Sequence, residues 1–227
     1  MEVQVLYTDN HVIVVNKRSG DIVQGDKTGD VPLSEDVKQY IKARYGKPGN
    51  VFLGVVHRLD RPVSGVLLFA RTSKALPRLN KMFAEHEKVR KTYWAIVANE
   101  PPAPEGTLTH WLTRDERNNT ARAYDREVPR SKLAVLDYRI LARSDRYRLL
   151  EVNLHTGRHH QIRCQLAKMG CPIKGDLKYG APRSNPDGSI SLHARRLTLE
   201  HPVTHEPLDI TAPVPADNLW QALTQGL

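Results

Sequence analysis

The chain has 227 residues, enough for one large domain or two small ones, and its 40% hydrophobic and 26% charged residues are ordinary for a soluble globular protein. It contains no apolar run as long as a membrane span and no signal-peptide pattern, which excludes a spanning helix and predicts a cytoplasmic protein. Its 34 Lys and Arg exceed 25 Asp and Glu, and the formal charge of +9 favours a polyanionic partner over an unspecialised basic protein, without separating RNA from DNA.

The first third of the chain predicts strands around one helix. Short strands are expected at residues 3–6 and 12–15, on either side of a turn at Asp9 and Asn10. Residues 34–45 are expected to form a helix that Ser34 caps and Gly46 ends, with acidic residues in its first turn and basic residues in its last. A short strand at 52–56 follows.

Residues 57–70 join a charged cluster to an apolar strand. The segment HRLDRPVSG, residues 57–65, turns at Pro62 and again at Ser64–Gly65, and residues 66–70 have the composition of a strand buried on both faces. Asp60 therefore lies just before a core strand, with an arginine on either side. A carboxylate there is either part of a structural ion pair or a reactive group on a rigid scaffold, and local chemistry leaves both interpretations open.

The remaining pattern alternates strands with two helices and a short terminal one. Helices are predicted over residues 75–83, with Ser73 as a possible cap, over 158–169, and after Asp217. Strands are predicted at 92–97, 107–112, 121–124, 133–141, 147–154, 191–199 and 208–211. Many strands, few helices and no regular βαβ alternation predict an α+β fold.

Five blocks of the chain resemble a known enzyme family in the family's own order. The segment HRLDRPVSG is similar to the His-Arg-Leu-Asp-x-x-x-Ser-Gly signature of the RluA-type pseudouridine synthases, and residues 9–20, 91–93, 155–163 and 175–180 resemble further blocks. Two positions depart from the family pattern: Val63 replaces a usual Thr, and Arg18 replaces a usual Pro. The resemblance implies a mixed, mostly antiparallel sheet with flanking helices, in a single catalytic domain over residues 1–227. We expect no N-terminal S4 RNA-binding domain, which some members carry.

By this resemblance the chain would isomerise uridine in RNA to pseudouridine. Asp60 would be the catalytic nucleophile, Arg163 would pair with its carboxylate, and Tyr93 would lie over the uracil and serve in removing the C5 proton. Breaking the N1–C1′ bond and forming C5–C1′ exchanges no electrons, so we expect no cofactor. An ionised Asp in a water-poor pocket needs a nearby cation, and the planar fork of an arginine suits a carboxylate.

Four further residues would contact the RNA. A uridine within an RNA stack must be flipped outward, and Arg58 would fill the space it leaves; a phosphate contact is the alternative. Ile162 would line the uracil pocket, although it also fits the packing face of its helix. His57 and Arg158, in the same blocks, are expected to contact RNA.

Other interpretations remain to be weighed. A non-catalytic RNA-binding or chaperone protein on the same fold is the main alternative, and a glycosidase would need a second acid such as Asp176 or Glu151 beside Asp60. His155 and His159 are four residues apart, but Gly157 and the expected helix start separate them, so we predict no metal site. Cys164 and Cys171 have neither the number nor the spacing for a disulfide framework or a thiolate zinc site.

The sequence predicts a class of RNA more than an individual substrate. Relatives by resemblance act on ribosomal large-subunit RNA or transfer RNA, and ribosomal RNA is favoured only as the commoner substrate. Stem-loop shape would be read by a basic surface. An arginine-dense segment could form part of that surface or be a solvated face: Arg114, Arg117, Arg122, Arg126 and Arg130. No obligatory protein partner is expected, and a monomer is the default.

Overall fold

The computed structural model describes residues 3–25, 29–85 and 88–227, and the contacts within the chain divide it into two compact units. The first unit comprises Met1–Val89 and Ala194–Pro213, and the second comprises Arg90–His193 and Val214–Leu227. A single catalytic domain over the whole chain stays a prediction. None of the helices in the described ranges is long and apolar enough to cross a bilayer.

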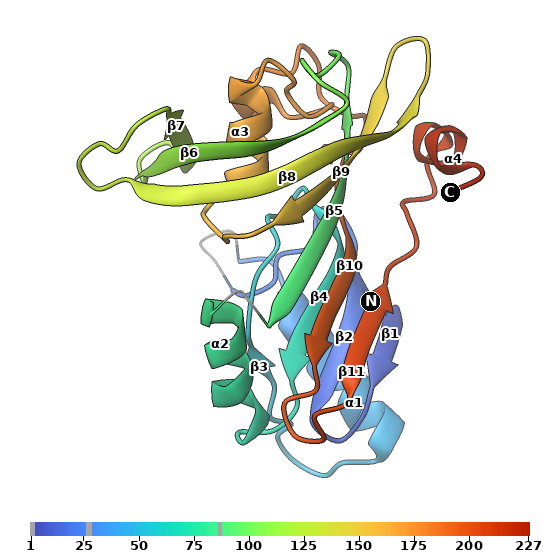
Figure 1. Cartoon of the computed structure of the whole chain (residues 1–227). Coiled ribbons are helices and arrows are strands. Elements are labelled where there is room, and N and C mark those ends of the chain that lie inside the picture. The colour runs from blue at the N-terminus through green and yellow to red at the C-terminus, as the bar shows by residue number, and fades with distance from the viewer. Residues whose placement is uncertain (1–2, 26–28, 86–87) are drawn as a thin grey trace. The chain divides into compact units, whose positions relative to one another are not determined.

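The first unit is built on a small sheet with a helix on either side. Its elements are β1 (Val5–Thr8), β2 (Val12–Lys17), α1 (Leu33–Tyr45), β3 (Gly54–Val55), β4 (Ser64–Ala70), α2 (Ala75–Glu85), β10 (Leu192–Glu200), which enters this unit at Ala194, and β11 (Pro207–Thr211) (Figure 1). The strands run in the order β1-β2-β4-β10, with β3 paired to β4 and β11 paired to β10. The β1–β2, β2–β4, β3–β4 and β10–β11 pairs are antiparallel.

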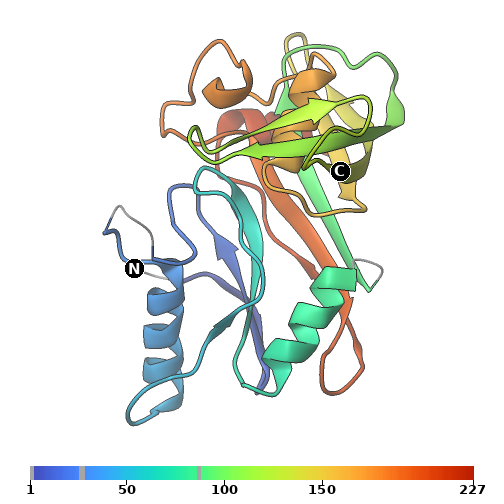
Figure 2. The ribbon, with the colours of Figure 1, turned by 90° about the vertical axis from the view of Figure 1, so that its left-hand side faces the viewer.

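Strand β4 is buried along its whole length, as its unbroken apolar run predicts. Successive strand side chains point to opposite faces, so such a strand needs cover on both. Val66 and Leu68 of β4 pack with Leu79 and Phe83 of α2 in one core cluster, which leaves the intervening Leu67 for the other face. Helices α1 and α2 lie on opposite sides of these strands (Figure 2). Asp60 thus precedes the most rigidly held strand of its unit.

The second unit is an antiparallel sheet that carries α3 and α4. Its elements are β5 (Val89–Val97), β6 (Glu105–Asp115), β7 (Thr120–Tyr124), β8 (Lys132–Arg143), β9 (Arg148–Leu154), α3 (Gln161–Lys168), the 3₁₀ turn η1 (Leu177–Tyr179) and α4 (Asn218–Thr224). The strand order is β5-β9-β8-β6-β7, and each of these pairs is antiparallel. The predicted α+β class is therefore confirmed, whereas β7 lies at the edge of this sheet and β6 pairs directly with β8.

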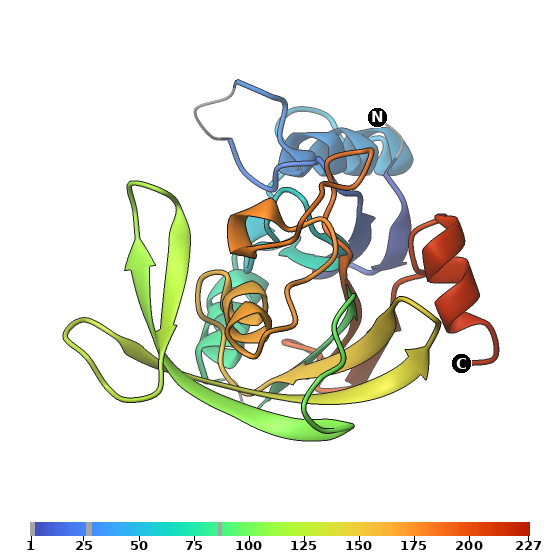
Figure 3. The ribbon, with the colours of Figure 1, turned by 90° about the horizontal axis from the view of Figure 1, so that it is seen from above.

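Each helix of this unit covers a different part of the sheet. Helix α3 packs through Cys164 against β6, β7 and β8, whereas α4 packs through Trp220 and Leu223 against β5 and β9. Figure 3 shows α3 against the curved strands and α4 near the β8–β9 end. All of Gln161 to Leu166 is buried, so α3 is an interior helix rather than one with a single apolar stripe.

The predicted cap of the first helix was wrong. Helix α1 begins after Pro32, whose φ of −75° suits a helix start, and no side chain caps it. The backbone N–H groups of Leu33 and Ser34 donate instead to the carbonyl oxygens of Ile22 and Val23, at 2.8 and 3.4 Å. Backbone carbonyls from an upstream segment thus satisfy the first N–H groups of the helix.

Two other helix starts also differ from expectation, and one agrees. Thr72, not Ser73, caps α2, because its hydroxyl accepts from the Ala75 N–H at 3.2 Å. Helix α3 begins three residues later than predicted, since His160 adopts a left-handed φ of 50°. Asp217 caps α4 as predicted, and its Oδ1 accepts from two backbone N–H groups at 2.8 and 3.1 Å.

Candidate active site

The loop that carries Asp60 is fixed at both of its ends. Leu59 is buried with 7% exposed surface, and the Val63 N–H donates to the Asp60 carbonyl at 3.0 Å. Val63 is itself buried, so the position where the family usually has Thr serves as an apolar anchor here. Asp60 is half-buried between these two anchors.

Gly65, in the Ser-Gly part of the motif, is required by a close backbone approach. Its φ is +116°, and a Cβ built there would lie 2.3 Å from the Ala194 carbonyl oxygen and 2.6 Å from the Ala194 nitrogen. No residue with a side chain fits between β4 and β10 at this point. The glycine therefore lets the strand after Asp60 lie directly against β10.

Lys17 is a part of this site to which the sequence analysis gave no role. It ends β2, lies opposite Gly65 in the β2–β4 register, and has 1% exposed surface. Its Nζ donates to the carbonyl oxygens of Arg18, Arg61 and Val63, at 2.9, 3.1 and 2.7 Å. The lysine thus ties the loop that follows Asp60 to the end of β2. A lysine at the end of the apolar run VIVVN was the signal for it.

The buried lysine gives this site a pH dependence. Burial lowers the pKa of Lys17 to about 8, against the opposing effect of the Asp21 and Asp60 charges. The ammonium form has three N–H donors for its three carbonyls, and the neutral amine has only two. We expect the single-turnover rate on RNA to fall as the pH rises through about 8, because one loop carbonyl then loses its donor.

Stability should respond in the opposite direction, which separates this effect from unfolding. The folded pKa lies below the ordinary value of 10.5, so between these two pH values the unfolded chain binds more protons and this group's contribution to stability rises with pH. Rates and melting temperatures measured together across this range test the expectation. A wild-type rate that stays flat through pH 8, or an unchanged falling limb in Lys17→Met, would contradict it.

His57 and Arg58 are held very differently. The His57 ring stacks on Phe83 with centroids 4.7 Å apart, and its Nε2 accepts from the Leu68 N–H at 3.1 Å. Accepting there requires an unprotonated Nε2, so His57 braces β4 against α2, and its contact with RNA stays a prediction. Arg58, next in the chain, is exposed.

In the second unit, Arg163 is buried with a carboxylate partner. Its Nε and Nη2 donate to the two oxygens of Asp176 at 2.6 and 2.8 Å, and the two side chains are only 6% and 1% exposed. Arg163 is therefore not a solvent-exposed charge on its helix. Gly175, just before Asp176, lets the chain pass close to the next loop: its φ is +90°, and a Cβ there would lie 2.7 Å from the Ser189 carbonyl oxygen.

A hydrogen-bond chain continues from Arg163 to a tyrosine. Nη1 of Arg163 lies 3.1 Å from His160 Nε2, and His160 Nδ1 lies 2.8 Å from the Tyr179 hydroxyl. A guanidinium can only donate, so Nε2 accepts and the His160 proton resides on Nδ1. The Tyr179 hydroxyl also accepts from the Ala121 N–H at 2.7 Å, and burial raises the pKa of Tyr179 to about 12. Neither this contact of His160 nor any role for Tyr179 was predicted from the sequence.

The other predicted site residues of this unit lie on β5 and around α3. Tyr93 is half-buried on β5, and strand alternation puts it on the face opposite Trp94, which packs with α4. Ile162 is buried on α3 beside Arg163. Arg158 precedes α3, and its Nε donates to the Leu133 carbonyl at 2.8 Å. Asp60, Arg58 and His57 thus belong to the first unit, and these residues with Arg163 belong to the second.

A family model described as RNA pseudouridylate synthase matches residues 11–168. The chain belongs to this family. A tRNA pseudouridine synthase C from Salmonella typhimurium is 36% identical over 98% of this chain and 89% of its own length. A Bacillus subtilis protein described as an uncharacterized RNA pseudouridine synthase is 33% identical over 95% of this chain and 70% of its own.

The fold agrees with the same family. A solved human protein titled RNA Pseudouridylate Synthase Domain Containing 4 has a TM-score of 0.77 and 24% identity, and the match covers 94% of this chain and 89% of that one. The family resemblance, the fold class and the enzyme class predicted from the sequence are confirmed. This pseudouridine synthase isomerises uridine in RNA. Within the described ranges, no group of three or more His, Cys, Asp or Glu side chains could hold a metal ion.

Proposed function

We propose that this pseudouridine synthase acts on a stem-loop of transfer RNA. The observation that carries the proposal is the relative named tRNA pseudouridine synthase C, which is 36% identical across 98% of the chain and is itself covered over 89% of its length. Ribosomal RNA, which the sequence favoured only as the commoner family substrate, has no such support from the relatives described above.

We further propose Asp60 as the nucleophile. The reaction breaks N1–C1′ of uridine, forms C5–C1′, removes the proton from C5 and leaves one on N1, so no atom is gained or lost. Attack on the ribose, attack on the base, and elimination to a glycal would all begin at this carboxylate. Three features favour Asp60: the anchors at Leu59 and Val63, the Lys17 clamp on the following loop, and the positive charge of Lys17.

The remaining predicted roles are assigned by family resemblance and fit the local structure of each residue. Arg163 would supply the cation that keeps the Asp60 carboxylate ionised, and its pairing with Asp176 holds the guanidinium in a fixed orientation. Tyr93 would lie over the uracil and serve in removing the C5 proton. Ile162, buried beside Arg163, would line the uracil pocket.

Arg58 would take the place of the flipped base, and its exposure leaves it accessible to RNA. Opening a stack costs a few kcal/mol, so Arg58→Ala is expected to lower kcat/KM on a folded stem-loop by about 100-fold. On an RNA whose target uridine is already unstacked, the same variant should lose far less. Equal losses on both RNAs would make Arg58 a phosphate contact instead.

Release of tritium from RNA labelled at uridine C5 tests the proposed function. The RNA should come from cells of the source organism that lack this gene, so that the target sites are unmodified, and it should be separated by size after the reaction. Formation of pseudouridine in the transfer RNA fraction is the expected result. Modification confined to large-subunit ribosomal RNA would overturn the proposed substrate while leaving the reaction intact.

A further inference from the structure

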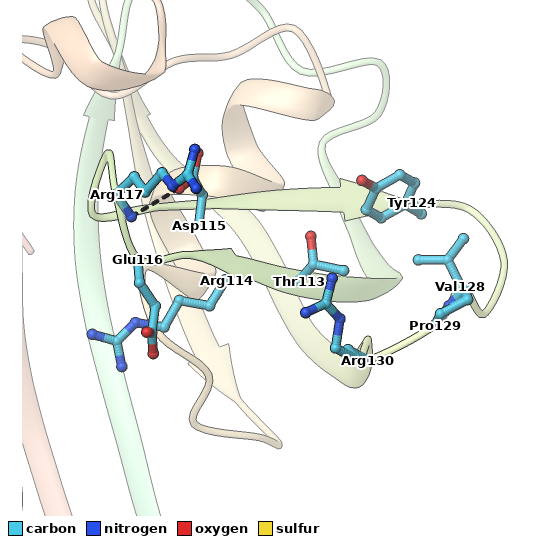
Figure 4. A pocket seen from close by; sticks show the side chains of 9 residues that line it. All are labelled: Thr113, Arg114, Asp115, Glu116, Arg117, Tyr124, Val128, Pro129 and Arg130. Atoms are coloured by element: carbon cyan, nitrogen blue, oxygen red, sulfur yellow. Dashed lines mark hydrogen bonds between the residues drawn. The ribbon is translucent and has the colours of Figure 1, made fainter.

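Two adjoining hollows mark the surface of the second unit. The larger, of about 940 Å³, lies between the β6–β7 hairpin and the loop that follows β7, with Arg114, Arg117 and Arg130 in its lining (Figure 4). The smaller, of about 260 Å³, is lined by Arg114 and Arg130 again, together with Lys132 and Arg158. Arg114 and Arg130 line both hollows, so the two adjoin. Together they are called here the basic groove.

The charge of the basic groove is strongly one-sided. Its cationic side chains are Arg114, Arg117, Arg130, Lys132 and Arg158, whereas its acids are Asp115 and Glu116, both in the larger hollow. The Asp115 carboxylate already accepts hydrogen bonds within the β6–β7 turn. Its donors are the backbone N–H groups of Arg117 and Asn118 and the Asn118 side-chain amide, at 3.0, 3.2 and 2.7 Å. The smaller hollow contains four cations and no acid.

Several basic residues elsewhere on this unit form salt bridges, whereas the five cations of the basic groove do not within the described ranges. Arg139 pairs with Glu151, Arg143 with Glu100, and Lys168 with Asp125, at 2.8, 3.2 and 3.0 Å. None of the five groove cations forms a salt bridge to any residue in the described part of the chain. Five cations held near only two acids repel one another unless an anion binds them. The groove therefore has the electrostatics of a polyanion site rather than of a solvated face.

One end of the basic groove lies beside predicted site residues, and this position suggests which anion the groove binds. The smaller hollow is closed by Gly157, Arg158 and His159, directly before α3, which carries Ile162 and Arg163. Resting on the proposed function, we propose that the basic groove binds the phosphodiester backbone of the RNA strand flanking the target uridine. Phosphate contacts of this kind set the register of a nucleic acid without reading its sequence.

The test combines three variants with two RNA probes. Arg114→Ala/Arg130→Ala removes the arginines common to both hollows, and Arg114→Lys/Arg130→Lys keeps their charge. Arg146→Ala is the matched control, because it removes an exposed arginine from the β8–β9 turn of the same unit, outside the groove. Dissociation constants for an unmodified transfer RNA transcript and for a 20-nucleotide oligouridine are measured at several salt concentrations, with melting temperatures as a check on folding.

The alanine double variant is expected to bind both RNAs about 100-fold more weakly at physiological salt. Its plot of log affinity against log salt should be shallower by about 1.4 to 1.8, since each lost phosphate contact removes about 0.7 to 0.9. The lysine variant should keep the wild-type slope, Arg146→Ala should match the wild type, and maximal turnover should fall far less than affinity.

Unchanged affinity and slope in the folded alanine variant would overturn the proposal, as would a loss confined to turnover. Tritium release by the wild type reports separately on the reaction. A second outcome is that the wild type releases no tritium while the alanine variant binds RNA more weakly and with a shallower salt dependence. That result would support the groove assignment and contradict the proposed function. If the wild type released tritium and the alanine variant kept the wild-type salt dependence of RNA binding, only the groove assignment would be contradicted.

Discussion

Asp60→Asn is expected to lower turnover by at least about 10⁴-fold while RNA binds as tightly as to the wild type. The amide keeps the shape of the side chain but loses the charge and the nucleophilic oxygen. The loop should survive the change, because Val63 donates to the backbone carbonyl of Asp60 and Lys17 donates to the carbonyls of Arg61 and Val63. Each of these bonds uses main-chain atoms that the substitution leaves in place.

The measurement is single-turnover tritium release at saturating RNA, with the dissociation constant and the melting temperature determined on the same preparation. Asp209→Asn is the matched control, since it neutralises an exposed aspartate of the same unit that pairs with Arg196. We expect wild-type turnover from the control. Substantial residual turnover in Asp60→Asn, at an unchanged melting temperature, would remove Asp60 from the role of nucleophile.

The sequence predicted those parts of the fold that depend on neighbouring residues. An unbroken apolar run gave β4, and the Asp217 carboxylate capped a helix three residues away. Sequence-based prediction was wrong where a contact with a distant segment, rather than the local residues, set the start of an element. Ser34 is a good cap by type, yet the helix already begins at Leu33, and the N–H groups of Leu33 and Ser34 donate to the carbonyls of Ile22 and Val23.

The candidate site shows the same division. Asp60, Tyr93 and Arg163 were predicted as site residues because the short sequence blocks that contain them resemble those of a family. Lys17 and the Arg163–Asp176 pair were missed as interactions, because their partners are 44, 46 and 13 residues away. The position of a lysine or an aspartate in the sequence does not show which carbonyl or guanidinium group it will contact in the folded chain. His160 was missed for a different reason: its left-handed backbone interrupts a segment whose composition is helical throughout.

Asp176→Asn is expected to lower the free energy of unfolding by about 3 to 5 kcal/mol, because it leaves the buried Arg163 guanidinium without its counter-charge. Turnover should fall as well, by about 100-fold or more, since Arg163 then loses the two-pronged contact that fixes its orientation. Glu151→Gln is the matched control in the same unit: its partner Arg139 is 58% exposed, and such a surface pair contributes less than about 1 kcal/mol.

A double variant separates stability from catalysis. Replacing a buried ion pair by apolar residues of similar volume is often neutral for stability, so Arg163→Met/Asp176→Leu should recover most of the unfolding free energy lost in Asp176→Asn. Turnover should nevertheless stay at or below the level of the Asp176→Asn variant, because the guanidinium proposed to keep the reacting carboxylate ionised is then absent. Denaturant unfolding and single-turnover tritium release on all four proteins make the comparison. A double variant that regained both stability and turnover would reduce the pair to a structural contact, whereas wild-type stability in Asp176→Asn would show that the buried pair does not form.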